Sequence, residues 1–197
     1  MNLVLRAKNV MFSPASEWEV IKQESITVGE LFLKYAVILA AIPAIAGFIG
    51  YSLFGISLGY ISYHVPVGAG ILWAVLTYVL SLVGVYIIAF IIDALAPSFG
   101  SAKDMTASLK VVVFAYTPSW VVGILYVIPS LSILVALAGI YALVLMYMGL
   151  QRVKNVPKDK MVGYFVVILI VAIVVYIIIG VIVSGIAFAG LFTARYY

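Results

Sequence analysis

Five long apolar runs, separated by short polar segments, dominate the pattern of this sequence. They cover about residues 31–50, 67–93, 107–128, 131–150 and 162–188. A helix of about 20 apolar residues crosses the hydrocarbon core of a bilayer, and each run has about that length or more. The pattern therefore predicts an all-α fold, a polytopic integral membrane bundle of five transmembrane helices within residues 27–197.

Residues 1–26 precede this membrane domain and predict two short interfacial helices on the cytoplasmic side. In residues 2–12, apolar side chains recur on one arc of a helix: Leu3, Val4, Ala7, Val10 and Met11. Such a helix is expected to lie in the membrane interface with its basic residues toward the headgroups, and a frayed terminus is the alternative. Ser13 and Pro14 begin the second helix, in which Trp18 suits an interface and glutamates keep one side in water: Glu17, Glu19 and Glu24.

Polar and turn-forming residues predict where the spans begin and end. Thr27 and Glu30 have the spacing of a capping box directly before the first span. Residues 51–65 are rich in Gly, Ser and Tyr, which predicts a short exterior loop at the interface. The third span is expected to begin at Ser101, where Ser101 and Asp104 have the spacing of a helix cap.

Composition agrees with a membrane location. The chain of 197 residues is 66% hydrophobic and 9% charged, against roughly 25% charged in an ordinary soluble domain. The absence of cysteine excludes disulfides and thiolate metal sites, and a single histidine excludes a multi-histidine metal site. That histidine, His64, lies in the predicted exterior loop, so no nucleophile and base pair can be assembled. We therefore expect a protein that is not an enzyme and that holds no cofactor.

Basic residues are sorted to one side of the predicted spans. Ten of the eleven lie before or just inside the first span, near the second-to-third connection, or in the fourth-to-fifth connection. Arg195 alone lies on the other side. Because positively charged segments stay in the cytoplasm, the N-terminus is expected inside and the C-terminus outside. The net charge of +4 reflects this sorting and does not indicate nucleic acid.

Asp93, at the end of the second span, is the first candidate functional residue. On one interpretation it binds a cation at the mouth of the bundle or pairs with Lys103 or Lys110. On the other it is an ordinary helix-end residue in contact with headgroups and water. A helix C-terminus disfavours a negative charge, which makes the position unusual.

The stretch from Tyr116 to Trp120 interrupts the third span with polar groups and a proline. One interpretation is a broken helix that lines a cavity, with the carbonyl freed by Pro118 directed at a ligand. The other is a proline kink in which the hydroxyls of Thr117 and Ser119 bond back to the backbone. Polar residues of the second and fourth spans would extend the first arrangement into a polar seam: Thr77, Tyr78, Ser81, Tyr141 and Tyr147.

An ordered set of motifs resembles the Yip1 domain family in its compact prokaryotic form. The motifs are NVMFSPASEWEVI before the first span, IIDALAPSFG at the end of the second, AYTPSW in the third and GIYALVLMYMGLQRVKNVP before the fifth. The resemblance covers almost the whole chain and implies a five-helix membrane domain. Eukaryotic members are Golgi and endoplasmic-reticulum proteins linked to Rab GTPases and vesicle traffic, with self-association. This chain has only about thirty residues before its first span, which argues against carrying over Rab binding.

The resemblance marks six positions as candidate functional residues: Asp93, Pro97, Tyr116, Pro118, Tyr141 and Gly149. Candidate residues of a cytoplasmic face are Trp18, Lys103, Arg152 and Lys154. We expect a non-enzymatic protein of a prokaryotic inner membrane that organises membrane or partner proteins through this face. Its partners would be the lipid bilayer, a membrane or cytoplasmic protein, and further copies of itself through small-xxx-small repeats at 46–50, 180–184 and 185–189. The alternative is a small-solute or ion transporter with a polar pathway near Tyr116, Pro118 and Asp93.

Overall fold

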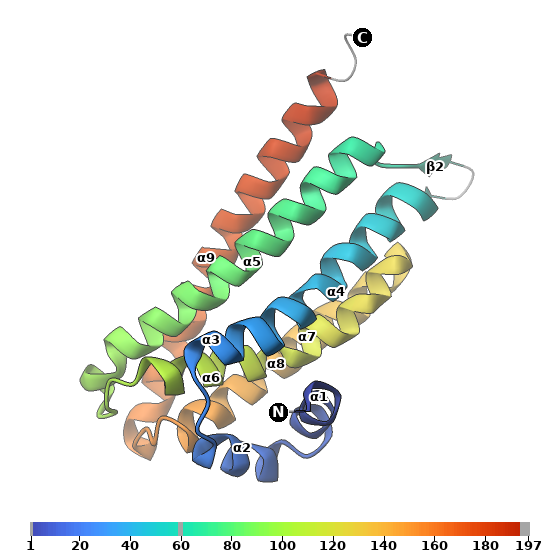
Figure 1. Cartoon of the computed structure of the whole chain (residues 1–197). Helices are drawn as coiled ribbons and strands as arrows, with labels where there is room; N and C mark the ends of the chain where they lie inside the picture. The colour runs from blue at the N-terminus through green and yellow to red at the C-terminus, as the bar shows by residue number, and fades with distance from the viewer. Residues whose placement is uncertain (1, 59–60, 194–197) are drawn as a thin grey trace.

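The structure is a bundle of long helices with a pair of short helices packed on one side of it. A computed structural model describes residues 2–58 and 61–193 (Figure 1). Within them, five helical segments are long and apolar enough to cross a membrane: Val28–Phe54, Val67–Phe99, Met105–Val127, Pro129–Arg152 and Lys158–Ile186. The predicted fold class, an all-α membrane bundle with five spans, is confirmed.

The first two spans are joined by a small β-ribbon. The first span consists of α3 (Val28–Leu31), a π-helical turn (Phe32–Ala36), α4 (Val37–Phe48) and a second π-helical turn (Ile49–Phe54). In the ribbon, β1 (Ile56–Leu58) pairs antiparallel with β2 (Ile61–Tyr63). The second span consists of α5 (Val67–Leu95) and a 3-10 turn (Ala96–Phe99).

The third span is broken, whereas the fourth and fifth are continuous. The third consists of α6 (Met105–Ala115), α7 (Thr117–Val122) and a 3-10 turn (Gly123–Val127). The fourth consists of a 3-10 turn (Pro129–Leu131) and α8 (Ser132–Arg152), and the fifth is α9 (Lys158–Thr193). The break follows from Pro118, which has no N–H to donate and clashes with the preceding turn inside a helix.

Helix caps confirm one predicted start and correct another. The capping box of Thr27 and Glu30 is present, with the Glu30 N–H donating to the Thr27 hydroxyl at 3.2 Å. The expected start at Ser101 is wrong, because α6 begins at Met105 and Asp104 is its N-cap. The Asp104 carboxylate accepts from the Ala107 N–H at 2.9 Å, whereas the Ser101 hydroxyl donates to the Lys154 carbonyl.

Residues 51–65 are not the simple loop that their polarity predicted. Helical structure continues to Phe54, because the Tyr51 ring packs against Trp73 with ring centroids 5.8 Å apart. The Tyr51 carbonyl also accepts from the Val65 N–H at 3.0 Å, so this end of the first span is tied to the start of the second.

The third span forms the centre of the bundle. Residues Ala107–Ala115 of α6 are all buried, and the fifth span is the most exposed of the five. α5 lies along α9, while α4 packs against α7 and the turn that follows it (Figure 1). The core therefore surrounds α6, and one long side of α9 faces outward.

The two predicted N-terminal helices are present as α1 (Leu3–Phe12) and α2 (Pro14–Gln23). α1 contacts α6 and α7, and α2 contacts α8, so the pair is docked on the bundle (Figure 1). Their expected orientation is partly wrong, because Arg6, Glu17 and Trp18 are buried instead of facing headgroups or water. The reason is pairing: two oppositely charged side chains can be buried together when each satisfies the other.

Candidate functional site

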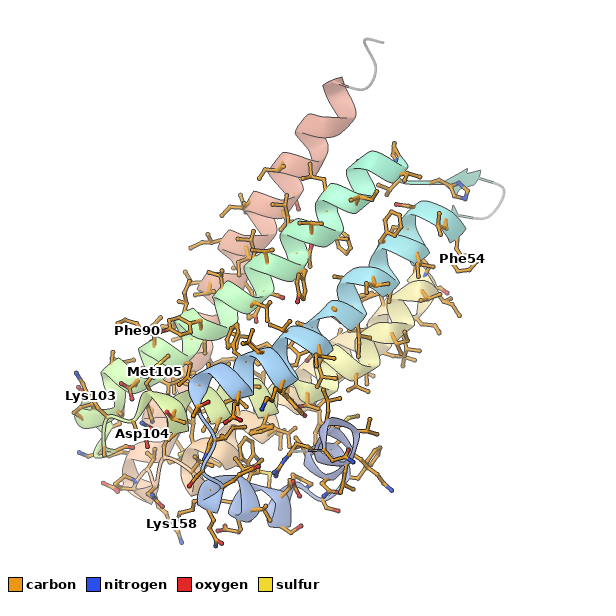
Figure 2. All side chains as sticks on the ribbon, viewed as in Figure 1. Phe54, Phe90, Lys103, Asp104, Met105 and Lys158 are labelled. Atoms are coloured by element: carbon orange, nitrogen blue, oxygen red, sulfur yellow. The ribbon has the colours of Figure 1, made fainter. Side chains whose placement is uncertain are left out.

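Charged side chains gather at one end of the molecule, which we call the charged end. It consists of α1, α2 and the residues that connect α2 to the first span, the start of that span, the last turn of α5 with the connection to α6 and the first turns of α6, and the last turn of α8 with the connection to α9 and the first turn of α9. Every acidic residue of the sequence and ten of its eleven basic residues lie in these segments. Lys103, Asp104 and Lys158 lie at this end, and Phe54 lies toward the opposite one (Figure 2).

The Arg6 cluster joins α1, α2 and α6. The Arg6 guanidinium donates to the carboxylates of Glu17 and Glu24, and the Arg6 and Glu17 side chains are each 9% exposed. The guanidinium carbon also lies 5.6 Å from the centroid of the Phe114 ring. The Lys110 ammonium donates to the carbonyls of Ile21, at 2.9 Å, and Glu24, at 2.5 Å. This cluster holds α2 against the central helix.

The Trp18 side chain packs directly against Gly149 of α8. It is 1% exposed, and a Cβ on Gly149 would lie only 2.8 Å from its indole ring. Phe114 meets the indole edge-on, with ring centroids 6.4 Å apart. The absence of a side chain at Gly149 therefore permits the close approach of α2 to α8.

Two further candidate residues hold the N-terminal pair on α8. The Tyr141 hydroxyl donates to the Met11 carbonyl at 2.7 Å. The Arg152 guanidinium donates to the Ala15 carbonyl and lies 3.7 Å from the Glu19 carboxylate. Trp18, Tyr141, Gly149 and Arg152, which are far apart in the sequence, thus belong to one docking surface.

The Lys154 cluster joins the two turns of the charged end. The Lys154 ammonium lies 3.4 Å from the Asp93 carboxylate and donates to the carbonyls of Ala102, at 2.8 Å, and Asp104, at 3.3 Å. Its side chain is 1% exposed, and this burial lowers the pKa of Lys154, against the opposing effect of Asp93.

Asp93 pairs with Lys154, so the expected pairing with Lys103 or Lys110 is wrong. Its carboxylate accepts from the Asp104 N–H at 2.6 Å and the Ser108 hydroxyl at 3.3 Å. A negative charge at the C-terminus of α5 is therefore stabilised by the N-terminus of α6. The ion pair and these two donors account for the unusual position of this carboxylate.

Pro97 and Lys103 lie on the surface of the same region. Both are exposed, Pro97 in the 3-10 turn after α5 and Lys103 just before α6. Between them, Gly100 adopts a left-handed conformation with φ of 74°, and a Cβ there would lie 3.1 Å from the Pro157 ring. The two turns of the charged end therefore touch.

The polar residues of the third span pack within the protein. The Thr117 and Tyr35 hydroxyls are hydrogen bonded at 2.9 Å, and both residues are fully buried. The Tyr116 ring lies between Trp120 and Tyr176, with centroid separations of 6.1 and 5.8 Å. The expected bond from Thr117 back to its own backbone is replaced by a bond between spans.

The predicted polar seam is not assembled. The Tyr78 hydroxyl donates to the Val37 carbonyl at 3.0 Å, and the Ser81 hydroxyl to the Tyr78 carbonyl at 2.8 Å. Tyr141 is used by α1, and Tyr147 packs edge-on against Phe165 with centroids 5.3 Å apart. These four groups are used in separate contacts between helices or, for Ser81, within α5, and the buried Thr77 hydroxyl has no hydrogen-bond partner in the described part of the chain.

Sequence reasoning did not single out Arg6, Glu17, Glu24, Lys110 or Tyr35 as a connected group. Two signals point to it. Arg6 lies directly beside Ala7 and four residues before Val10, on the face of α1 that is buried. Lys110 lies inside an apolar run, where a charge is costly without a partner.

These features define a polytopic helical membrane protein whose buried charges and mid-span polar groups are used for packing. Groups of three or more His, Cys, Asp or Glu residues that would hold a metal ion are absent from the described part of the chain. The sequence pattern of the Yip1 domain matches residues 8–192, and the chain belongs to the Yip1 domain family.

The chain is similar to the inner membrane protein YohC of Escherichia coli strain K12. The two are 28% identical over 156 residues, which cover 75% of this chain and 77% of the relative. The inner membrane protein YohC of Escherichia coli O6:H1 is similar to the same extent. No solved structure matches the chain.

Proposed function

We propose that this protein is a non-enzymatic organiser of membrane or partner proteins that acts through its charged end. We place the charged end, with the N-terminus, in the cytoplasm of a bacterial cell and the spans in its inner membrane. The observation that carries the proposal is the docking of α1 and α2 through buried ion pairs and Trp18, which gives this end a defined surface.

Lysines outnumber carboxylates on the two exposed turns of this surface, where Asp104 and Asp159 are the exposed acidic residues. Lys103, Lys158 and Lys160 are exposed on the two turns that touch through Gly100 and Pro157. Because a cluster of lysines attracts anionic groups, it suits an acidic protein segment or anionic headgroups. The sorting of basic residues to this end supports its cytoplasmic placement. The name of the relative YohC supports the inner membrane.

A transport pathway is not favoured. Asp93, proposed as its inner mouth, is held by Lys154 and by two donors of α6. Thr117 is bonded to Tyr35, and Pro118 is buried. A hydrated path would need polar groups whose hydrogen bonds are open to water or solute.

Thiol labelling in a chain without native cysteine tests both parts of the proposal. Single cysteines from Val113 to Val122 are treated in intact cells and in inverted vesicles with a membrane-impermeant maleimide. Lys103→Cys and His64→Cys, both at exposed positions near opposite ends, are the matched controls. We expect labelling of Lys103→Cys only in inverted vesicles, of His64→Cys only in intact cells, and no labelling from 113 to 122. Labelling of one helical face around Tyr116 would contradict the organiser proposal and favour a transporter.

Photo-crosslinking tests the organising role itself. A photoreactive amino acid is placed at Lys103 or Lys158, with His64 as the exterior control, and adducts are examined after illumination of living cells. We expect one recurrent protein or lipid adduct at the basic positions, and we expect the adduct at position 158 to be lost when Lys103 and Lys160 are replaced by Glu. Equal adduct patterns at Lys158 and His64 would contradict a role for the charged end.

A further inference from the structure

α1 departs from the pattern of a helix that lies on water, because one buried position is charged and several outward positions are large and apolar. Its inward face carries the charged Arg6 together with Ala7 and Val10. Its outward face carries Val4 and Phe12, which are 73% and 75% exposed. A surface helix in water directs its apolar stripe inward and its polar side outward. The outward residues of α1 therefore fit a hydrocarbon environment.

The contacts of α1 place it deep along the bundle. Met11 accepts a hydrogen bond from Tyr141, which lies three helical turns from the end of α8 at Arg152. At about 1.5 Å per residue, those eleven residues span roughly 16 Å along α8, so the contact with α1 lies within the membrane-spanning part of this helix. Arg6 lies beside Phe114, near the break in the third span, and α1 contacts α7 beyond that break.

Three polar groups on or next to α1 have partners within the protein. The Asn2 side chain accepts from the Leu5 N–H at 3.1 Å, and the Met11 carbonyl accepts from Tyr141. Arg6 forms ion pairs with Glu17 and Glu24, and the Lys110 ammonium, which donates to the Glu24 carbonyl, supplies the second positive charge of the cluster. Because unpaired backbone groups and charges are costly at this depth, these pairings permit insertion. The exposed Lys8 has a long stem that allows its ammonium to reach the headgroups.

The outward face of α1 is continuous with the lipid-facing side of the fourth span. Ile140 and Val144, which flank Tyr141 on α8, are 61% and 50% exposed. A membrane-embedded bundle contacts acyl chains with such residues. Since Tyr141 joins α8 to α1, the same apolar surface extends from α8 onto α1.

We propose that α1 is inserted into the hydrocarbon of the charged-end leaflet, where Val4, Leu5 and Phe12 contact lipid acyl chains. This rests on the proposed function, because it names the leaflet lipid as a direct partner of the charged end. A ten-residue helix about 15 Å long and 10 Å wide occupies roughly 150 Å² of one leaflet and none of the other. The protein thereby expands that leaflet and favours membrane that is convex toward the charged end.

Depth-dependent quenching tests the insertion. Full-length protein with Leu5→Cys or Phe12→Cys carries an environment-sensitive fluorophore and is reconstituted in phosphatidylcholine–phosphatidylglycerol vesicles. The lipids are brominated either near the carbonyl or in mid-chain. Glu19→Cys on α2, whose side chain is 54% exposed beside Arg152, is the matched surface control. Val10→Cys, at a position 1% exposed, is the buried control.

We expect mid-chain bromine to quench the fluorophores at positions 5 and 12 more strongly than bromine near the carbonyl, and aqueous iodide to have little effect. Position 19 should show the reverse, and position 10 should respond to neither. Strong iodide quenching at position 12 would overturn the proposal and place α1 in water. A disulfide between two chains at Phe12→Cys with no lipid quenching would also overturn it, since a second copy would then cover the patch.

Vesicle curvature supplies a second readout. Labelled protein is reconstituted in vesicles of mixed diameter, with the charged end outside, and its density is measured on single vesicles. We expect enrichment on small vesicles and a loss of enrichment when Phe12 and Leu5 are both replaced by Asn. Equal density of the protein and of the double Asn variant at all diameters would overturn the proposed expansion of one leaflet by α1. A failure here with an intact adduct at Lys103 in cells would leave the proposed function standing.

Discussion

The packing of Trp18 against Gly149 gives a sharp prediction, because a second glycine of α8, Gly139, serves as the control. A Cβ on Gly149 would meet three indole atoms at 2.8 to 3.1 Å, whereas a Cβ on Gly139 would have nothing within 4 Å. Gly→Ala raises helix propensity by about 1 kcal/mol at either position. Overpacking typically costs about 1–3 kcal/mol and applies to Gly149 alone. The difference between the two alanine variants therefore isolates the contact with Trp18.

The contact is measured as release of α2 from the bundle. Ile21 is fully buried in α2, so Ile21→Cys reports the opening of this helix to a thiol reagent. A free energy of 1–3 kcal/mol corresponds to roughly a 5- to 150-fold change in the open population. We expect Gly149→Ala to accelerate labelling by that factor relative to Gly139→Ala in the same background.

Equal labelling rates for the two variants would refute the reasoning. They would mean that Trp18 does not occupy the space above Gly149, or that α2 is held by the Arg6 cluster alone. A slower rate for Gly149→Ala than for Gly139→Ala would be a stronger contradiction, because both variants share the gain in helix propensity and the added Cβ at Gly149 would then stabilise the contact with Trp18. Unfolding midpoints of both variants check that α8 itself remains intact.

Two further predictions concern buried polar groups. Tyr35→Phe leaves the buried Thr117 hydroxyl without its partner and should lower the free energy of unfolding by about 1–3 kcal/mol. Thr117→Val added to the same chain should restore most of this loss, and no recovery would contradict the pairing. For Lys154, burial lowers the pKa in the folded state below the unfolded value of 10.5. Between these two pKa values the unfolded chain holds more protons than the folded chain, so the free energy of unfolding should increase as the pH rises through this window. Lys154→Met should flatten this rise in pH-dependent thermal unfolding, and an unchanged slope would assign it to other groups.

The proposed role of the charged end depends on a division between buried and exposed charge. Buried charges such as Arg6 and Lys154 are used to dock helices and close turns. Exposed charges such as Lys103 and Lys158 are left on the surface. This division allows the surface to be altered in experiments without loss of the fold, which is what the crosslinking and charge-reversal tests require.

The number of spans and their approximate positions followed from the sequence alone. Twenty or more apolar residues in succession have few structural outcomes, because the bilayer requires every backbone group to be satisfied within the segment. The box at Thr27 and the break at Pro118 are likewise local effects of side-chain oxygen and ring geometry. The family resemblance also depended on ordered local motifs, and the match over residues 8–192 confirms it.

The partners of the polar residues were decided by the tertiary structure. Glu17 and Trp18 have the composition of a wet interfacial helix, and nothing in their neighbourhood indicates that Arg6 and Gly149 will enclose them. From the sequence, Lys103, Lys110 and Lys154 all lie in or near the turns of the charged end and could pair with Asp93. The packing of the two turns against each other brings Lys154 to it. Local sequence determines which segments become helices, since hydrogen bonding and hydrophobicity act over a few residues. Which polar side chain is buried against which depends on contacts between residues more than a hundred positions apart, as between Tyr141 and Met11, and only the folded bundle specifies those.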